Sequence, residues 1–267
     1  MEVRVLSSAP PSLGEVLRSG LLNALGVRHG FNLRAGGAST AAPYASFNLG
    51  RAVGDDPAHV DENHRRFARA LGFEHGALHE VSQVHGGVAL AIERAADPRA
   101  FRQREADALV APSGGVAAGV RIADCAPVLL FDTDSGAAAA IHAGWRGTVA
   151  GVVEAACALL LGTGSGRAPA LRAAIFPHIR RCCFEVGDDV AAELRAASPD
   201  PDVVDRSRAR PHVDLAAILV AKLDALGIAR EHVDDVAGCT RCEPERFFSY
   251  RRGGAQSGRH LCAIVSR

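Results

Sequence analysis

The chain has 267 residues with 30 basic and 30 acidic side chains, so its formal net charge at pH 7 is zero. This balance gives no electrostatic sign of a nucleic-acid or membrane partner, and the sequence shows no 18-residue apolar span and no secretory signal. Its seven cysteines, an odd number, indicate reduced thiols or metal ligands in a cytoplasmic protein.

In chain order, the pattern predicts an extended run at 3–6, a polar loop over 27–40 and an amphipathic helix over 57–71. Further helices are expected over 148–161, with Thr148 as a cap, and over 188–197 and 214–226. Strands are predicted for the apolar runs 77–84, 88–92, 106–110, 116–123, 127–131, 137–141, 171–176, 233–238, 247–250 and 260–265.

These elements indicate one mixed α/β (α+β) domain over residues 1–267. The predicted strands come in clusters rather than in strict alternation with helices, which argues against a Rossmann fold or a barrel. No internal repeat and no long linker divides the chain.

The stretch 123–148 organises the candidate chemistry. Its two apolar runs are joined by a turn-rich segment, and a hairpin folded symmetrically about Thr133 and Asp134 would set Cys125 directly opposite His142. Facing residues of antiparallel strands have Cβ atoms roughly 4.5–5.5 Å apart. A thiolate and an imidazole placed in this way could share one metal ion or one proton.

His85 also lies at the end of a predicted strand. One cysteine and two histidines form a set that suits Zn²⁺ and leaves a fourth position open for water or substrate. The alternative is that these residues are structural, because cysteine is often buried and a lone histidine is seldom a ligand.

The other candidates have weaker patterns. Cys239 and Cys242 form a C-x-x-C pair, and Cys182 and Cys183 are adjacent. We expect these four to be structural thiols, since adjacent side chains of an extended strand point to opposite faces. Arginines could clamp a phosphate, and Arg34 stands beside two glycines whose amides could form an anion cradle; an ordinary surface loop is the preferred interpretation. The arginines in question are Arg34, Arg146, Arg251, Arg252 and Arg259.

Several motifs together resemble those of the YfiH family, often called laccase-domain proteins or multicopper polyphenol oxidases. They are S-Q-V-H-G (82–86), A-D-A-L-V (106–110), A-D-C-A-P-V-L-L-F-D (123–132), H-A-G-W-R-G-T (142–148), C-C-F-E-V-G (182–187) and F-F-S-Y-R-R (247–252). The resemblance implies a mixed α/β sandwich of sheets flanked by helices. It also implies a zinc ion held by His85, Cys125 and His142.

The activity that the resemblance implies is phosphorolysis of the purine nucleosides adenosine, inosine, guanosine and methylthioadenosine, with deamination of adenosine. By motif position, we expect Arg34 and Arg146 to contact phosphate, Asn48 to contact ribose or base, and Asp124 to orient a ligand from behind.

Three alternatives stay open. The first is a metal-free hydrolase or amidase with Cys125 as nucleophile and His142 as base. The second is a binding module whose metal is purely structural. The third, a copper oxidase, is disfavoured because no two of the eleven histidines are separated by one residue and the only methionine is Met1.

Overall fold

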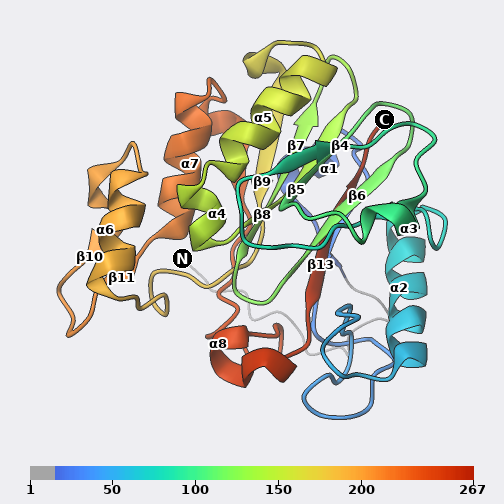
Figure 1. The fold of residues 1–267 in the computed structure, drawn as a ribbon, viewed down its shortest axis with the longest axis horizontal. Coiled ribbons are helices and arrows are strands. Elements are labelled where there is room, and N and C mark those ends of the chain that lie inside the picture. Colours follow the sequence, from blue (N-terminus) through green and yellow to red (C-terminus); the bar gives the residue numbers. More distant parts are fainter. Residues whose placement is uncertain (1–15) are drawn as a thin grey trace, which may run out of the picture.

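A computed structural model of the chain describes residues 16–267 and contains two stacked β-sheets with helices on their outer faces (Figure 1). The expected extended run at 3–6 lies outside the described residues. The five-stranded sheet has the order β1 (Val16–Leu17), β2 (His29–Asn32), β13 (His260–Val265), β6 (Ala117–Ile122), β3 (Leu78–His79). The six-stranded sheet has the order β12 (Val233–Asp235), β9 (Leu171–Ile175), β7 (Ala126–Asp132), β8 (Ala138–Ala143), β5 (Ala108–Ala111), β4 (Ala89–Ala91).

Both sheets are mixed. Neighbouring strands are antiparallel except for the pairs β3–β6, β4–β5 and β9–β12. Side-chain alternation along β7 shows how the layers pack: Leu129 and Phe131 enter the core between the two sheets, while Val128 and Leu130 enter the core beneath the helices. Both faces of β7 are therefore buried, which explains its continuous apolar sequence.

Helices cover the two outer faces. On the six-stranded sheet lie α5 (Val152–Thr163), α6 (Asp188–Ala196) and α7 (Leu215–Ala225), opposite α2 (Pro57–Leu71) across the molecule (Figure 1). Helix α2 packs Phe67 and Leu71 against the outer face of the five-stranded sheet. Its predicted bounds are confirmed, with Asp56 capping the start and Gly72 in the left-handed region at the end. The predicted mixed α/β sandwich is thus confirmed, while a single domain over 1–267 stays a prediction.

Shorter elements complete the part of the chain that the structure describes. They are the helices α1 (Gly20–Ala24), α3 (Pro98–Phe101), α4 (Trp145–Val149) and α8 (Tyr250–Gly253), the strand pair β10 (Val204–Asp205) and β11 (His212–Val213), and 3₁₀ turns at Ala168–Ala170, Pro201–Val203, Arg230–His232 and Gly254–Gln256. Within residues 16–267, no helix combines the length and the apolar character that a membrane crossing needs.

Three local predictions were wrong. The segment 27–40 is not all loop, because it contains the fully buried strand β2. The expected strand at 247–250 is absent from the described chain, where this segment leads into α8. The single helix over 148–161 is two helices, α4 and α5, separated at Gly151 with φ +81°. Thr148 lies inside α4 and caps neither helix.

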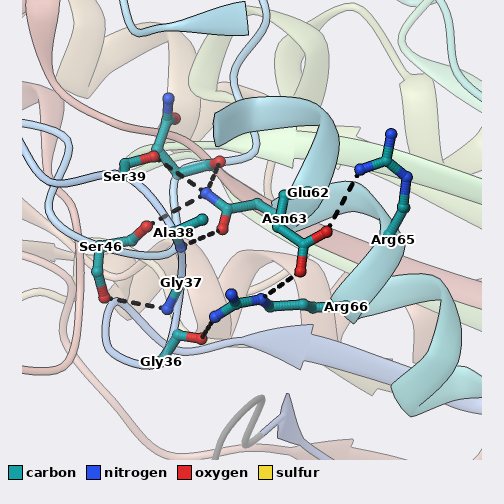
Figure 2. A network of polar contacts seen from close by, with 10 residues as sticks. Gly36, Gly37, Ala38, Ser39, Ser46, Glu62, Asn63, Arg65 and Arg66 are labelled. Atoms are coloured by element: carbon teal, nitrogen blue, oxygen red, sulfur yellow. Dashed lines mark hydrogen bonds and ion pairs between the residues drawn. The ribbon is translucent and has the colours of Figure 1, made fainter. Parts of the chain in front are cut away.

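The loop after Arg34 is held onto α2 by side chains (Figure 2). Asn63 accepts a hydrogen bond from the Ala38 amide at 2.6 Å and donates to the carbonyl of Asn48 at 2.8 Å. The Gly37 amide donates to the Ser46 hydroxyl at 3.1 Å. Because these two loop amides are bonded within the protein, the ordinary loop describes this segment better than the anion cradle does.

A buried carboxylate, Glu80, lies just after β3 and is 1 % exposed. Its closest cation is Arg121, at 3.2 Å, and Arg51 and Arg102 each approach to 3.9 Å. Burial alone would raise the pKa of Glu80, but the three guanidinium groups hold it below its ordinary value. The carboxylate is therefore ionised in the fold and depends on these arginines.

Candidate metal and catalytic site

His85, Cys125 and His142 meet at one end of the six-stranded sheet. Cys125 directly precedes β7, His142 lies near the end of β8, and His85 lies in the loop between β3 and β4. Each of the three residues places one possible ligand atom within 4.8 Å of the ligand atoms of the other two. His142 is buried, Cys125 is half-buried and His85 is exposed, so solvent reaches the group from the His85 side.

The hairpin that joins Cys125 to His142 has a register two residues away from the predicted one. Pro127 pairs with His142, and this register continued would place Gly144 opposite Cys125. The observed turn is longer than the predicted one, which was symmetric about Thr133 and Asp134. It closes where the Asp132 amide donates to the Ala137 carbonyl at 2.9 Å. A shift of two residues keeps a side chain on the same face, so His142 still meets Cys125 as a diagonal neighbour.

Asp107, directly before β5, completes the group and is missing from the sequence-based prediction. Its Oδ1 accepts a hydrogen bond from His142 Nδ1 at 2.7 Å and from the His85 amide at 3.0 Å. Its Oδ2 accepts from the Gly86 amide at 2.6 Å. The sequence offered one indication of its role. Asp107 is the single charged residue in the otherwise apolar run 106–110, and a buried charge needs hydrogen-bonding or ionic partners.

The hydrogen bond from His142 Nδ1 to Asp107 determines which ring nitrogen of His142 can act on a ligand. With Nδ1–H donating to Asp107, the Nε2 atom is left to face Cys125 and His85. Burial alone would lower the pKa of His142, but the Cys125 thiolate and Asp107 raise it to about 9. Burial would raise the pKa of Cys125, but His142 and His85 lower it to about 6. Without a metal, the pair is a thiolate beside an imidazolium.

The same residues fit a zinc ion. Cys Sγ and two histidine nitrogens are donors that Zn²⁺ favours, and a carboxylate behind one histidine is the usual support of such a ligand. The described residues supply three donors here and not four. A three-donor group leaves a position for water or substrate, which is characteristic of catalytic rather than structural zinc sites.

Two residues with left-handed backbone hold the group. His85 has φ +62° and Asp124 has φ +90°, and they are the two non-glycine residues with positive φ in the described chain. The Asp124 carboxylate accepts hydrogen bonds from Thr240 Oγ1 at 2.6 Å and Ser249 Oγ at 2.9 Å. Asp124 thereby fixes the backbone next to Cys125 to the C-terminal part of the chain.

Gly144 lies against His85 and Cys125, where a side chain would fit only tightly. A Cβ atom there would lie 3.0 Å from Cys125 Sγ and 3.3 Å from a ring carbon of His85. Its φ of −71° is open to any residue, so the requirement for glycine comes from this close approach.

The expected substrate residues lie in different surroundings. Arg34 donates to the carbonyls of Ala45 at 3.0 Å and Pro244 at 2.8 Å. Asn48 is fully buried, and both atoms of its amide are hydrogen-bonded within the protein. Arg146 is exposed and its guanidinium lies 4.4 Å from the ring centre of Trp145. A contact of Asn48 with a nucleoside stays a prediction and would require one of these bonds to break.

Comparison with known proteins gives consistent matches over most of the chain. The family model described as "Multi-copper polyphenol oxidoreductase laccase" matches residues 28–267. A purine nucleoside phosphorylase from Deinococcus radiodurans is 40 % identical over 241 residues, covering 90 % of this chain and 89 % of that protein. An adenosine deaminase from an unknown prokaryotic organism is 34 % identical, covering 84 % and 88 %.

Solved structures show the same fold. The crystal structure of YlmD from Geobacillus stearothermophilus has a TM-score of 0.86 and 30 % identity, covering 96 % of this chain and all of that one. The hypothetical protein YfiH of Bacillus licheniformis has a TM-score of 0.84 and 26 % identity, covering 92 % and 94 %. The resemblance seen in the sequence motifs is thereby confirmed.

Proposed function

This chain belongs to the multi-copper polyphenol oxidoreductase laccase family, which includes the YfiH-type proteins, and from that premise we propose that it is a zinc-dependent purine nucleoside phosphorylase that also deaminates adenosine. The observation that carries the proposal is the three-donor group of His85, Cys125 and His142 with Asp107 behind it. Relatives named purine nucleoside phosphorylase and adenosine deaminase supply the reaction class.

In this proposal, His85, Cys125 and His142 hold the zinc ion, which would supply Lewis-acid activation of water at neutral pH. Asp107 keeps the His142 proton on Nδ1 and so keeps Nε2 available as a donor. Arg146, which is exposed and lies two residues after Gly144, and Arg34 would provide positive charge for the phosphate that phosphorolysis consumes.

The direct test measures two reactions on the purified protein: hypoxanthine release from inosine and phosphate, and inosine formation from adenosine. We expect both in the zinc-loaded protein and loss of both in Cys125→Ala. Cys157→Ala is the matched control, because Cys157 is a buried thiol of α5 away from the group. Unchanged hypoxanthine release by Cys125→Ala would refute the role of the zinc ligand.

A second candidate follows from the pKa values. A thiolate, an imidazolium and a carboxylate in series form a cysteine–histidine–aspartate arrangement that could attack an amide without a metal. His85 discriminates between the two functions, since a simple Cys–His mechanism does not require it. If His85→Ala keeps the full catalytic activity of the wild-type protein and chelators do not lower that activity, the metal-free hydrolase is the better description. Loss of both zinc and activity in His85→Ala supports the phosphorylase.

Copper is the third possibility, raised by the name of the family. The sequence has none of the His-x-His pairs of multicopper centres. We therefore propose zinc as the resident metal. Metal analysis of protein purified without added metal tests this choice, and a stoichiometric amount of copper would overturn it.

A further inference from the structure

Four cysteines outside the site above bring their sulfurs together. They are Cys182 and Cys183, in the loop after β9, and Cys239 and Cys242, in the loop after β12. The Sγ atom of Cys242 lies 3.2 Å from that of Cys183 and 3.5 Å from that of Cys182, and all four sulfurs lie within 4.8 Å of one another. A tetrahedral zinc ion with Zn–S bonds of about 2.3 Å separates its sulfurs by about 3.8 Å. The spacing of the cluster is therefore that of a tetrathiolate site.

Local backbone structure explains how adjacent cysteines can converge. In extended backbone, adjacent side chains point to opposite faces, so Cys182 and Cys183 were not expected to reach one ion. In the structure they lie in a turn, in which the amides of Cys183 and Phe184 both donate to the Arg180 carbonyl at 2.8 Å. The turn brings both sulfurs to one side, which removes this geometric objection, while the expectation of structural thiols stays a prediction.

The C-x-x-C pair also lies in a turn. The Glu243 side chain accepts a hydrogen bond from the Cys239 amide at 2.7 Å, and the Glu243 amide donates to the Cys239 carbonyl at 3.2 Å. The two loops are joined by the Thr240 amide, which donates to the His178 carbonyl at 3.1 Å. The cluster is thus preorganised by backbone bonds that do not involve the sulfurs.

The surroundings suit the charge of such a site. Four thiolates around one divalent ion leave a net charge of −2, which needs nearby donors and cations. The side chains of Arg208 and Arg252 donate to the carbonyls of Cys182 and Thr240, at 3.1 and 3.0 Å.

We propose that Cys182, Cys183, Cys239 and Cys242 bind one zinc ion as a second, structural metal site of this protein. With four protein ligands it is closed, whereas the group around Cys125 has three and keeps a position open. Thr240 lies within this second site and donates to Asp124, the neighbour of Cys125. The tetrathiolate site therefore fixes the C-terminal loops and, through Asp124, positions the backbone of the first site.

The test counts metal ions rather than activity, so it is independent of the proposed function. We expect two zinc ions per chain in protein purified with reductant and zinc, and one in the double variant Cys182→Ser/Cys242→Ser. Cys125→Ala should also retain one zinc ion. Replacing that ion with cobalt should produce the sulfur-to-metal absorption of a tetrathiolate site. Cys157→Ala, the matched thiol control, should retain both.

If the double variant does not fold, Cys242→His provides the check, because imidazole can replace one thiolate as a zinc ligand. It should keep two zinc ions per chain and shift the cobalt spectrum of the second site. The proposal is overturned by a single zinc in the wild-type protein that Cys125→Ala removes. It is equally overturned by a disulfide between any two of the four cysteines in protein kept under reductant.

Discussion

Replacing Asp107 by asparagine should weaken zinc binding and folding together, because one buried carboxylate serves both. Its Oδ1 accepts from His142 Nδ1 and the His85 amide, and its Oδ2 accepts from the amides of Gly86 and Val84. Asparagine offers one oxygen and one NH₂ group. Whichever way the new amide turns, its NH₂ group faces one of the two pairs of donors, of which His142 Nδ1 is buried and the three amides are partly buried.

The magnitudes follow from those contacts. An unsatisfied buried donor costs about 1–3 kcal/mol, and partly buried amides cost less, so Asp107→Asn should lower the free energy of unfolding by about 1–3 kcal/mol in total. Loss of the carboxylate behind a metal-ligating histidine lowers metal affinity about 10- to 100-fold. Competition with a chromophoric chelator measures the zinc affinity, and urea unfolding of the metal-free protein measures the stability.

Asp132→Asn is the matched control. Asp132 is also fully buried, and its carboxylate accepts from Asp134, Ser135 and Ser165 at the other end of the β7–β8 hairpin. Asp132→Asn should lose similar stability and leave unchanged the zinc affinity of the site that we propose at His85, Cys125 and His142. Equal loss of zinc affinity in both variants would show that Asp107 acts only through folding, and the reasoning would fail.

Three further predictions follow from other contacts. Gly144→Ala places a methyl group 3.0 Å from Cys125 Sγ and should weaken zinc binding by the roughly 1–3 kcal/mol of an overpacked contact, measured by chelator competition, whereas Gly162→Ala, with open space around it, should not. Glu80→Ala leaves three partly exposed arginines without their carboxylate and should cost about 1–3 kcal/mol of stability in urea unfolding; an unchanged free energy of unfolding would contradict the ion cluster. Burial lowers the pKa of His260 to about 3, so the unfolded chain binds a proton below about pH 6.5 that the folded chain does not. Metal-free protein should therefore lose about 1.4 kcal/mol per pH unit from this histidine as pH falls from 6.5 toward 3, and equal stability at pH 7 and pH 5 would refute this.

Periodic apolar patterns explain what the sequence could predict. Helix α2 and strands β7, β8 and β13 were all expected, because each buries a regular set of apolar side chains. Strand β2 was missed since two of its four residues are polar. His29 and Asn32 are fully buried there, and their side chains are satisfied by hydrogen bonds that only the tertiary fold supplies.

The residues of the candidate site were likewise predicted only in part. Family motifs pointed to His85, Cys125 and His142, and the structure brings their ligand atoms together. Asp107 could not be ranked above other acidic residues from the sequence, because its importance lies in a hydrogen bond across 35 positions of the chain. The convergence of the four cysteines could not be predicted, since it depends on turns that periodicity does not reveal.

The place of β13 has a consequence for how the protein is made. This strand pairs with β2 on one side and with β6 on the other, so it forms the middle of the five-stranded sheet. During synthesis, β2 and β6 leave the ribosome long before residues 260–265 and have no strand to join them. The six-stranded sheet can assemble earlier, whereas the five-stranded sheet is incomplete until β13 is synthesised. Until then its unpaired strand edges are exposed to chaperones or to self-association.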